Sequence, residues 1–231
     1  LLAVFGGSVV SVFTIANLFK YLFANYPILI WAFFFGLILA SVYFVGKRIE
    51  KWNTASICAI LIGTIVAISL SFITPASENS NLFFVFLCGI IGISGMMLPG
   101  LSGSFILILM GNYELLMVTA VTDLNAVLLA TFFIGSAVGL MSFSHILSWV
   151  LKYYKDATLA LLTGFILGSL RIIWPWKEVT KSVILNGKEK VLEYDWYFPL
   201  TMNQDTLLAC IAILVGIVIV YGLEKYSPKK N

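Results

Sequence analysis

The chain is 231 residues long, and 61% of its residues are hydrophobic while only 11% are charged. A water-soluble domain could not bury so much apolar surface, so we expect lipid to surround most of this protein. The net charge of +3 is too small and too dispersed to indicate nucleic-acid binding. The three cysteines lie in apolar runs without the spacing of a metal site, so we expect neither a metal nor another cofactor.

Apolar segments recur along the chain at lengths that approach the ~20 residues a helix needs to cross a membrane. We predict helices over 1–23, 27–46, 55–74, 126–151, 157–174 and 205–223. The polar stretch from about 175 to 204 is predicted to be a loop. Aromatic residues gather at the polar breaks, as they do at membrane interfaces. The expected fold class is an all-α, multi-pass membrane protein.

Basic residues form three short clusters, at 46–51, 152–155 and 224–230. Short basic loops favour the cytoplasmic side of a membrane. If all three clusters lie there, the loop at 175–204 lies on the opposite side, and the segment 83–120 begins and ends on that opposite side too. An even number of crossings predicts that this segment is a hairpin, which enters the membrane and returns.

An internal repeat relates the two halves of the chain. Residues 7–41 align with residues 135–169 without a gap, and Gly36 coincides with Gly164. The predicted orientation places the turns of the two copies on opposite sides of the membrane. The repeats are therefore expected to be inverted, an arrangement typical of transporters.

The repeats define two expected domains. Residues 1–80 are the remainder of the first inverted repeat, and residues 81–231 are the second. In the second copy a broken hairpin precedes the helix that carries Gly135. By symmetry, a matching hairpin should precede Gly7, upstream of Leu1.

The stretch "MMLPGLSGSFILILMGNYE", residues 96–114, interrupts the apolar pattern. Pro99 lacks an N–H and disfavours helical geometry before it, while Gly100 and Gly103 allow close backbone approach or positive φ. In lipid such a break survives only where protein or a wet cavity surrounds it. We predict that a helix resumes near Ser104 and covers "SFILILMGNYELL", residues 104–116.

The start of that helix is a candidate anion site. The amides of Leu101 to Ser104 would point into the membrane interior beside the hydroxyls of Ser102 and Ser104. Such a cluster favours a phosphate or a carboxylate. The alternative is a tight turn with capping serines and helix packing through small residues.

A catalytic interpretation competes for the same residues. "GLSG" (100–103) matches the GxSG signature of intramembrane serine proteases, and His145 could activate the Ser102 hydroxyl. Pro99 before the motif, and the bulky Trp149 four residues after His145, argue against a close approach of the two helices.

Charged residues near the predicted membrane ends form a further set of candidates. Glu114 and Asp123 are hypotheses for proton coupling, because intramembrane acids are costly and often functional. Arg171 either meets a lipid phosphate in the outer leaflet or extends to the interface.

"LPGLSGSFILILMGNYE" (98–114), followed by "GFILGSLRIIWPWK" (164–177), closely resembles the bacterial PopT family of polyprenyl-phosphate transporters. The resemblance runs over essentially the whole chain. It implies an inverted-repeat protein of the bacterial cytoplasmic (inner) membrane that returns undecaprenyl phosphate from the outer to the inner leaflet. This flippase activity recycles the carrier lipid for peptidoglycan and other envelope polymers. It requires no covalent chemistry, so we do not expect an enzyme.

The resemblance also implies site residues. A phosphate head group would bind at Pro99, Gly100, Ser102, Gly103 and Ser104, to which we add the amide of Leu101 and the guanidinium of Arg171. Candidates for coupling or gating are Tyr113, Glu114, Asp123 and His145. The expected partners are a polyprenyl-phosphate lipid and the bilayer, while a coupling ion (proton or sodium) and a homodimer stay open.

Two other functions also stay open at this point. One is a permease for a small soluble anion that uses the same hairpin, and the other is the serine protease built on Ser102 and His145. A purely structural scaffold would not explain a broken hairpin inside an inverted repeat.

Overall fold

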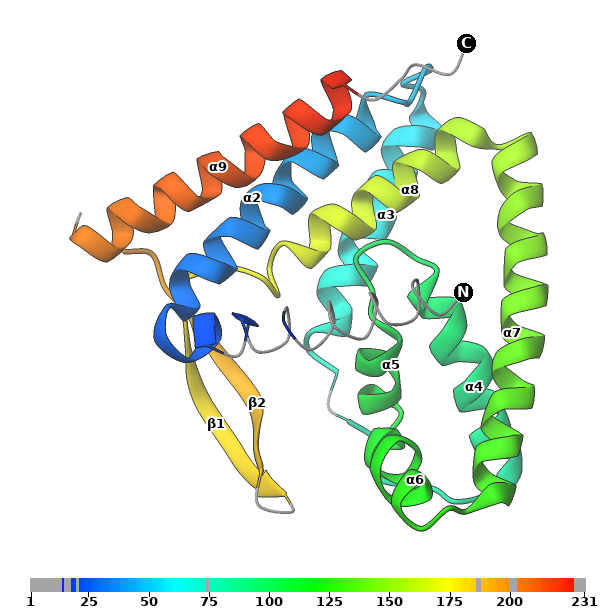
Figure 1. The fold of residues 1–231 in the computed structure, drawn as a ribbon. Coiled ribbons are helices and arrows are strands. Elements are labelled where there is room, and N and C mark those ends of the chain that lie inside the picture. Colours follow the sequence, from blue (N-terminus) through cyan, green and yellow to red (C-terminus); the bar gives the residue numbers. More distant parts are fainter. Residues whose placement is uncertain are drawn as a thin grey trace. The chain divides into compact units, whose positions relative to one another are not determined.

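The structure is a computed structural model that describes residues 14, 18–19, 21–73, 75–185, 188–199 and 203–226, with side chains except at 179 and 181–194. The described chain is mostly helical (Figure 1). It divides into two compact units, Leu1–Ala40 with Ile173–Asn231, and Ser41–Ile172. These units differ from the division at residue 80 that the repeat predicts. That division concerns sequence symmetry, and it stays a prediction.

Three helices in the described residues are long and apolar enough to cross a membrane: α2 (Pro27–Gly46), α7 (Ala126–Tyr153) and α9 (Gln204–Tyr226). Two shorter apolar helices are α3 (Thr54–Leu70) and α4 (Leu82–Met96). These bounds agree with the apolar segments. Most of the helix predicted over 1–23 lies outside the described residues. The helix predicted over 157–174 is α8 (Lys155–Ser169), which ends earlier because the chain turns at Leu170.

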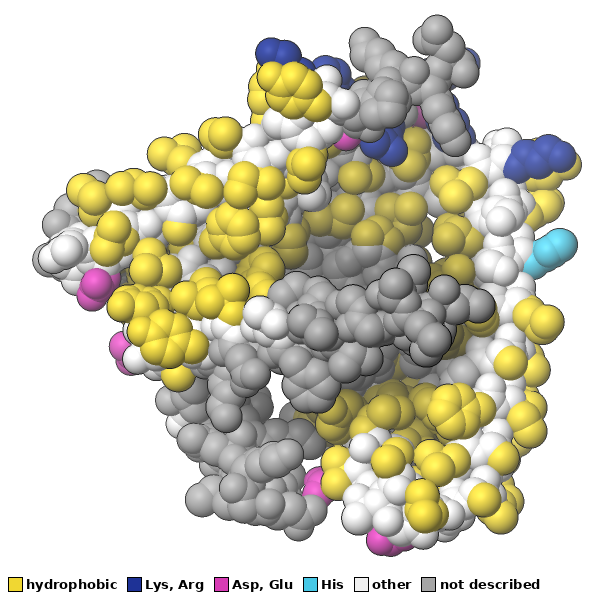
Figure 2. All heavy atoms as spheres, in the orientation of Figure 1, with side chains coloured by type: hydrophobic (Ala, Val, Ile, Leu, Met, Phe, Trp, Pro, Cys, Tyr) yellow, Lys and Arg dark blue, Asp and Glu magenta, His cyan; other side chains and the backbone are white. Residues whose placement is uncertain are grey.

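The surfaces of the long helices are apolar, as expected for protein in contact with lipid. On α7, Phe133 is 64% exposed and Met141 is 73% exposed, and on α9, Val218 is 66% exposed. Figure 2 shows hydrophobic side chains over much of the visible surface of both helices. Water could not solvate these side chains favourably, so their exposure supports the membrane assignment.

The unit of Leu1–Ala40 and Ile173–Asn231 holds most of α2, a β-hairpin and α9. Helices α2 and α9 approach closely, since a Cβ on Gly36 would collide with the carbonyl of Ile213, and one on Gly216 would meet the carbonyl of Phe33. Small residues at such crossings are typical of packed membrane helices. Beside the crossing, Trp176 packs in a small core with Ala32 and Ala209, joined by the partly buried Trp174.

The polar stretch predicted to be a loop contains a two-stranded antiparallel sheet, so this prediction was wrong. Strand β1 (Lys177–Leu185) pairs with β2 (Lys188–Trp196), with Lys177 opposite Trp196 and Leu185 opposite Lys188. The sequence signal was the Asn-Gly dipeptide at 186–187, which favours two-residue hairpin turns between strands. Charged residues within both strands obscured the alternating pattern.

The unit Ser41–Ile172 is built from two helix pairs, α3 with α8 and α4 with α7. Between α4 and α7 lie α5 (Gly103–Leu109), the π-helical turn η1 (Leu115–Thr119) and the short α6 (Ala120–Thr122). The buried core of this unit joins these elements and consists of Val85, Cys88, Leu107, Leu115, Leu116, Ala120 and Leu128. Segments on both sides of the break are therefore anchored in one apolar core.

Candidate functional site

The break between α4 and α5 is a tight turn at Leu98–Leu101. The N–H of Leu101 donates to the carbonyl of Leu98 at 3.2 Å, and Gly100 has a φ of +89°. Proline at the second position and a positive-φ glycine at the third are the residues that a type II turn requires. The prediction that Pro99 and Gly100 interrupt the helix is confirmed.

This turn packs against the last turns of α8. A Cβ built on Gly100 would lie 2.8 Å from the carbonyl oxygen of Phe165 and 3.2 Å from Oγ of Ser169. The buried Ser169 hydroxyl donates to the carbonyl of Ile166 at 2.8 Å. Gly100 is thus required twice, for its positive φ and for the close approach to α8.

The two serine hydroxyls predicted at the site lie together. Oγ of Ser102 and Oγ of Ser104 are 2.7 Å apart, and both residues are exposed. Ser102 is the N-cap residue of α5, but its side chain makes no capping hydrogen bond. Of the alternative, the tight turn and the small-residue packing at Gly100 are confirmed, whereas capping by the Ser102 side chain is wrong for this structure. Its hydroxyl and that of Ser104 are presented to the surroundings beside the first amides of α5.

Helix α5 is shorter than predicted, because a second break follows it. It ends at Leu109, where Gly111 (φ +76°) donates to the carbonyl of Ile108 at 2.9 Å and Asn112 donates to that of Leu107 at 3.0 Å. This pair of bonds is a Schellman motif, which stops a helix at a left-handed residue. The later part of the helix predicted over 104–116 is replaced by a turn and then by η1.

Sequence reasoning missed Asn112, which fixes this second break. Its fully buried side chain accepts a hydrogen bond from the Asn79 N–H at 2.9 Å and donates to the Asn79 carbonyl at 2.8 Å. The N–H of Ala76 also donates to the carbonyl of Leu109 at 2.9 Å. A Gly-Asn pair after an apolar run was the available signal. Helix α5 is consequently held at both ends, by α8 and by the loop at 76–79.

Arg171 follows α8 two residues after Ser169. Its guanidinium lies over the ring of Phe72, 4.6 Å from the centroid. This cation–π contact stabilises a cation next to an apolar surface. It places Arg171 on the same end of α8 as the turn at Gly100, whereas its contact with a lipid phosphate stays a prediction.

The four coupling or gating candidates are not gathered at one point. Tyr113 packs on the buried core, and Glu114 is half-buried at the start of η1. Asp123 is exposed at the end of α6, and His145 is exposed on α7. Across the described residues, no three His, Cys, Asp or Glu side chains form a cluster that could hold a metal.

The structure does not assemble the dyad that a serine protease would need. The Ser102 hydroxyl bonds to Ser104, and among the described residues no hydrogen bond joins it to His145. A nucleophile and its base should lie within hydrogen-bond reach. The catalytic interpretation therefore has no geometric support here.

A family model described as "VCA0040-like: Undecaprenyl phosphate translocase-like" matches residues 1–191 of the chain. The chain belongs to this family. That membership agrees with the resemblance seen in the sequence, and together with the apolar helices it makes this a membrane protein. The translocase-like match covers both breaks, α8 and β1.

Two relatives are named polyprenyl-phosphate transporter. The one from Vibrio cholerae serotype O1 (strain ATCC 39315 / El Tor Inaba N16961) is 38% identical over 236 residues, 99% of this chain and 76% of its own length. The one from Staphylococcus aureus (strain NCTC 8325 / PS 47) is 29% identical over 187 residues, 73% of this chain and 66% of its own length. No solved structure matches the chain.

Proposed function

We propose that this protein transports a polyprenyl phosphate across the membrane and that the turn between α4 and α5 receives the phosphate head group. The observation that carries the proposal is the exposed Ser102–Ser104 hydroxyl pair, next to helix-start amides that no Ser102 side chain caps. The names of two relatives support the substrate class. Pro99, Gly100, Leu101 and Gly103 shape the turn, and Arg171 stands on the same end of α8.

The chemistry of the substrate fits neutral donors. A phosphate head that leaves water without new hydrogen-bond partners loses at least several kcal/mol. Hydroxyls and amides can replace some of those partners without adding a charge to the membrane interior. Helix α5 has only seven residues, so the local hydrogen bonds rather than a long helix dipole carry this argument.

Repeated helix packing supports the inverted repeat. In the aligned repeat α2 corresponds to α8, so by chain order α3 corresponds to α9. Helix α2 crosses α9 at Gly36 and Gly216, and α8 crosses α3 at Gly164 and Gly63, each glycine facing a backbone carbonyl of the partner helix. In each of these two pairs, one helix therefore belongs to the first repeat and the other to the second. This exchange explains why the compact units cut across the expected domains.

We further propose that the segment of α4 and α5 is a re-entrant hairpin in the bacterial cytoplasmic membrane and that the substrate is undecaprenyl phosphate. Transport would run from the outer to the inner leaflet and serve envelope-polymer synthesis. Glu114 or Asp123 would couple it to protons, if an ion gradient drives it. This orientation rests on the three basic clusters.

The test is leaflet exchange of a labelled polyprenyl phosphate in liposomes that contain the full-length protein. We expect rapid exchange, and about a tenfold loss in Ser102→Ala/Ser104→Ala, which removes two hydrogen bonds to a charged group. The matched control is Ser136→Ala/Ser144→Ala on α7, where both hydroxyls bond to carbonyls of their own helix. Normal exchange in the first variant would contradict the head-group site. Transport of inorganic phosphate instead of lipid would favour the small-anion permease.

A further inference from the structure

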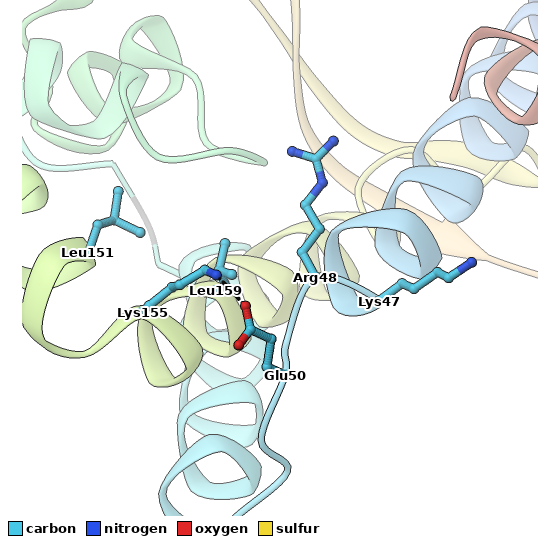
Figure 3. A pocket seen from close by; sticks show the side chains of 6 residues that line it. All are labelled: Lys47, Arg48, Glu50, Leu151, Lys155 and Leu159. Carbon is cyan, nitrogen blue, oxygen red and sulfur yellow. Dashed lines mark hydrogen bonds and ion pairs between the residues drawn. The ribbon is translucent and has the colours of Figure 1, made fainter. Parts of the chain in front are cut away.

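A basic pocket lies at the opposite end of α8 from the turn at Gly100. It has a volume of about 610 Å³ and is lined by Lys47, Arg48, Glu50, Leu151, Lys155 and Leu159 (Figure 3). Three of these side chains are cations and one is an acid. The remaining two are half-buried leucines, so the pocket combines positive charge with an apolar wall.

The wall of this pocket is fixed by several contacts. Lys155 forms an ion pair with Glu50 at 2.5 Å, and the N–H of Glu50 donates to Oδ1 of Asp156 at 2.9 Å. Ile49, which precedes Glu50 in the sequence, is buried, with only 4% of its surface exposed. The linker from α2 to α3 is thereby attached to the first turn of α8, which fixes this wall of the pocket.

The cations of the pocket are arranged unequally. In Figure 3, the Arg48 and Lys47 side chains extend from the linker in different directions, while Lys155 meets Glu50. The Glu50 carboxylate raises the pKa of Lys155, first through their hydrogen bond, so this ammonium stays charged at neutral pH. An arginine fork and an ammonium are together a strong pair of phosphate ligands.

Aromatic side chains mark the depth of the pocket in the membrane. The Trp149 ring contacts those of Tyr153 and Tyr154, with centroids 5.5 and 6.0 Å apart, and all three residues are exposed. Exposed tryptophan and tyrosine are enriched at the level of lipid head groups. They flank Leu151 and Lys155 in the sequence, which supports a position of the pocket at the level of lipid phosphates.

We propose that this pocket binds the phosphate of a lipid in the leaflet on the side of the three basic clusters. Arg48 and Lys155 would contact the phosphate, and Leu151 and Leu159 would contact the hydrocarbon chain of the lipid. Its role as the receiving site for a transported polyprenyl phosphate rests on the proposed function. Helix α8 has 15 residues, so its ends are separated by about 21 Å. The head group would leave neutral donors at one end of α8 and reach cations at the other.

The experiment measures occupancy of the pocket directly. In a variant of the full chain whose Cys58, Cys88 and Cys210 are replaced by alanine, Leu159→Cys is labelled with a maleimide in phosphatidylcholine vesicles. We expect farnesyl phosphate and dioleoyl phosphatidate to slow labelling, while farnesol and inorganic phosphate do not at the same concentration. Protection by farnesol, or no protection by either lipid phosphate, would overturn the proposal. Equal protection by inorganic phosphate would overturn the assignment to a lipid.

Charge variants identify the ligands of the phosphate. Arg48→Ala should raise the half-protecting concentration of farnesyl phosphate about tenfold, because a charge-assisted fork is lost. Lys152→Ala is the matched control: this exposed lysine is next to Leu151 but does not line the pocket, and the half-protecting concentration should stay within about twofold. An equal effect of both substitutions would mean that general surface charge, and not the pocket, attracts the phosphate.

The proposal for the turn and the proposal for the pocket can be contradicted independently. Ser102→Ala/Ser104→Ala should leave protection of Leu159→Cys intact while it slows leaflet exchange. If exchange is normal in that variant and protection still depends on Arg48, the pocket stands and the head-group turn is wrong. If exchange is lost there but Arg48→Ala changes no protection, the turn stands and the pocket is wrong.

Discussion

The two phosphate sites proposed at the ends of α8 differ in their donors. At the end near Ser169, the turn at Gly100 offers hydroxyls and amides with little side-chain volume. At the start of α8, the pocket offers Arg48 and Lys155. A cation deep in lipid is expensive, whereas at the interface it remains hydrated. Under the two proposals, depth in the membrane decides whether dipoles or charges serve as phosphate ligands.

The largest expected effect is on the turn itself. Gly100→Val forces a branched side chain into a positive φ and against the backbone of Phe165, which we expect to lower the free energy of unfolding by about 3 kcal/mol or more. Thermal unfolding in detergent measures this change. Gly222→Ala on α9 is the control, because a Cβ there meets no atom within 4 Å and should stabilise by about 0.5–1 kcal/mol. Equal stability of both variants would contradict the close packing of the turn on α8.

The second break should be nearly as sensitive. Asn112→Ala removes two buried hydrogen bonds and leaves both backbone groups of Asn79 unpaired, at an expected cost of about 2–3 kcal/mol. Faster amide hydrogen exchange at Asn79 and a lower melting temperature would follow. Asn25→Ala, which removes an exposed side-chain bond to the Tyr21 carbonyl, should change the melting temperature little. A stable Asn112→Ala protein would mean that the loop at 76–79 does not hold α5.

A smaller effect concerns a lysine on the first strand. Burial lowers the pKa of Lys177 to about 8, and its ammonium lies 3.7 Å from the Trp31 ring centroid. Above about pH 8 the folded chain releases this proton, while the unfolded chain keeps it until about 10.5, so this group makes stability rise with pH in that window. Lys177→Met should remove that rise and stabilise the protein at pH 7. Melting temperatures from pH 7 to 10, with the exposed Lys225→Met as control, check this; equal slopes in all three proteins would contradict it.

The smallest effect on stability is expected at the pocket. Glu50→Gln breaks an ion pair between two exposed side chains, which should hardly change the melting temperature. It also removes the acid that competes with a phosphate for Lys155, so farnesyl phosphate should protect Leu159→Cys at about a threefold lower concentration. Weaker protection would show that Glu50 positions Lys155 rather than competing for it. That result would sharpen the contrast with the turn, where hydroxyls and amides are the main proposed donors.

Much of the fold was readable because its signals are local. The apolar segments gave α2 almost to the residue, and Pro99 with Gly100 gave the position of the first break. The β-hairpin was missed although an Asn-Gly dipeptide marked it, because charged strands lack clear alternation. The early end of α5 was missed because a glycine in an apolar run can belong to a helix or end it, and only φ at Gly111 distinguishes the two.

The candidate site was predictable only in part. The residues of the turn follow from the motif and from its resemblance to a transporter family. Motifs could not identify Asn112, Ser169 or the pocket at Arg48. Each of these features depends on contacts with residues that are distant in the sequence. Asn112 is polar in an apolar neighbourhood, but its partner at Asn79 is 33 residues away.

The sequence by itself determined that this protein resides in lipid and where the first break, at Pro99 and Gly100, lies, because hydropathy and backbone preference act over a few neighbouring residues. Its motifs also identified the family to which the chain belongs. Only the tertiary structure decided which helices cross at which glycines, that the Gly100 turn rests on α8, and that Lys155 meets Glu50. Those contacts join residues as far apart in the sequence as Phe33 and Gly216, and close packing selects them only when the whole chain is folded.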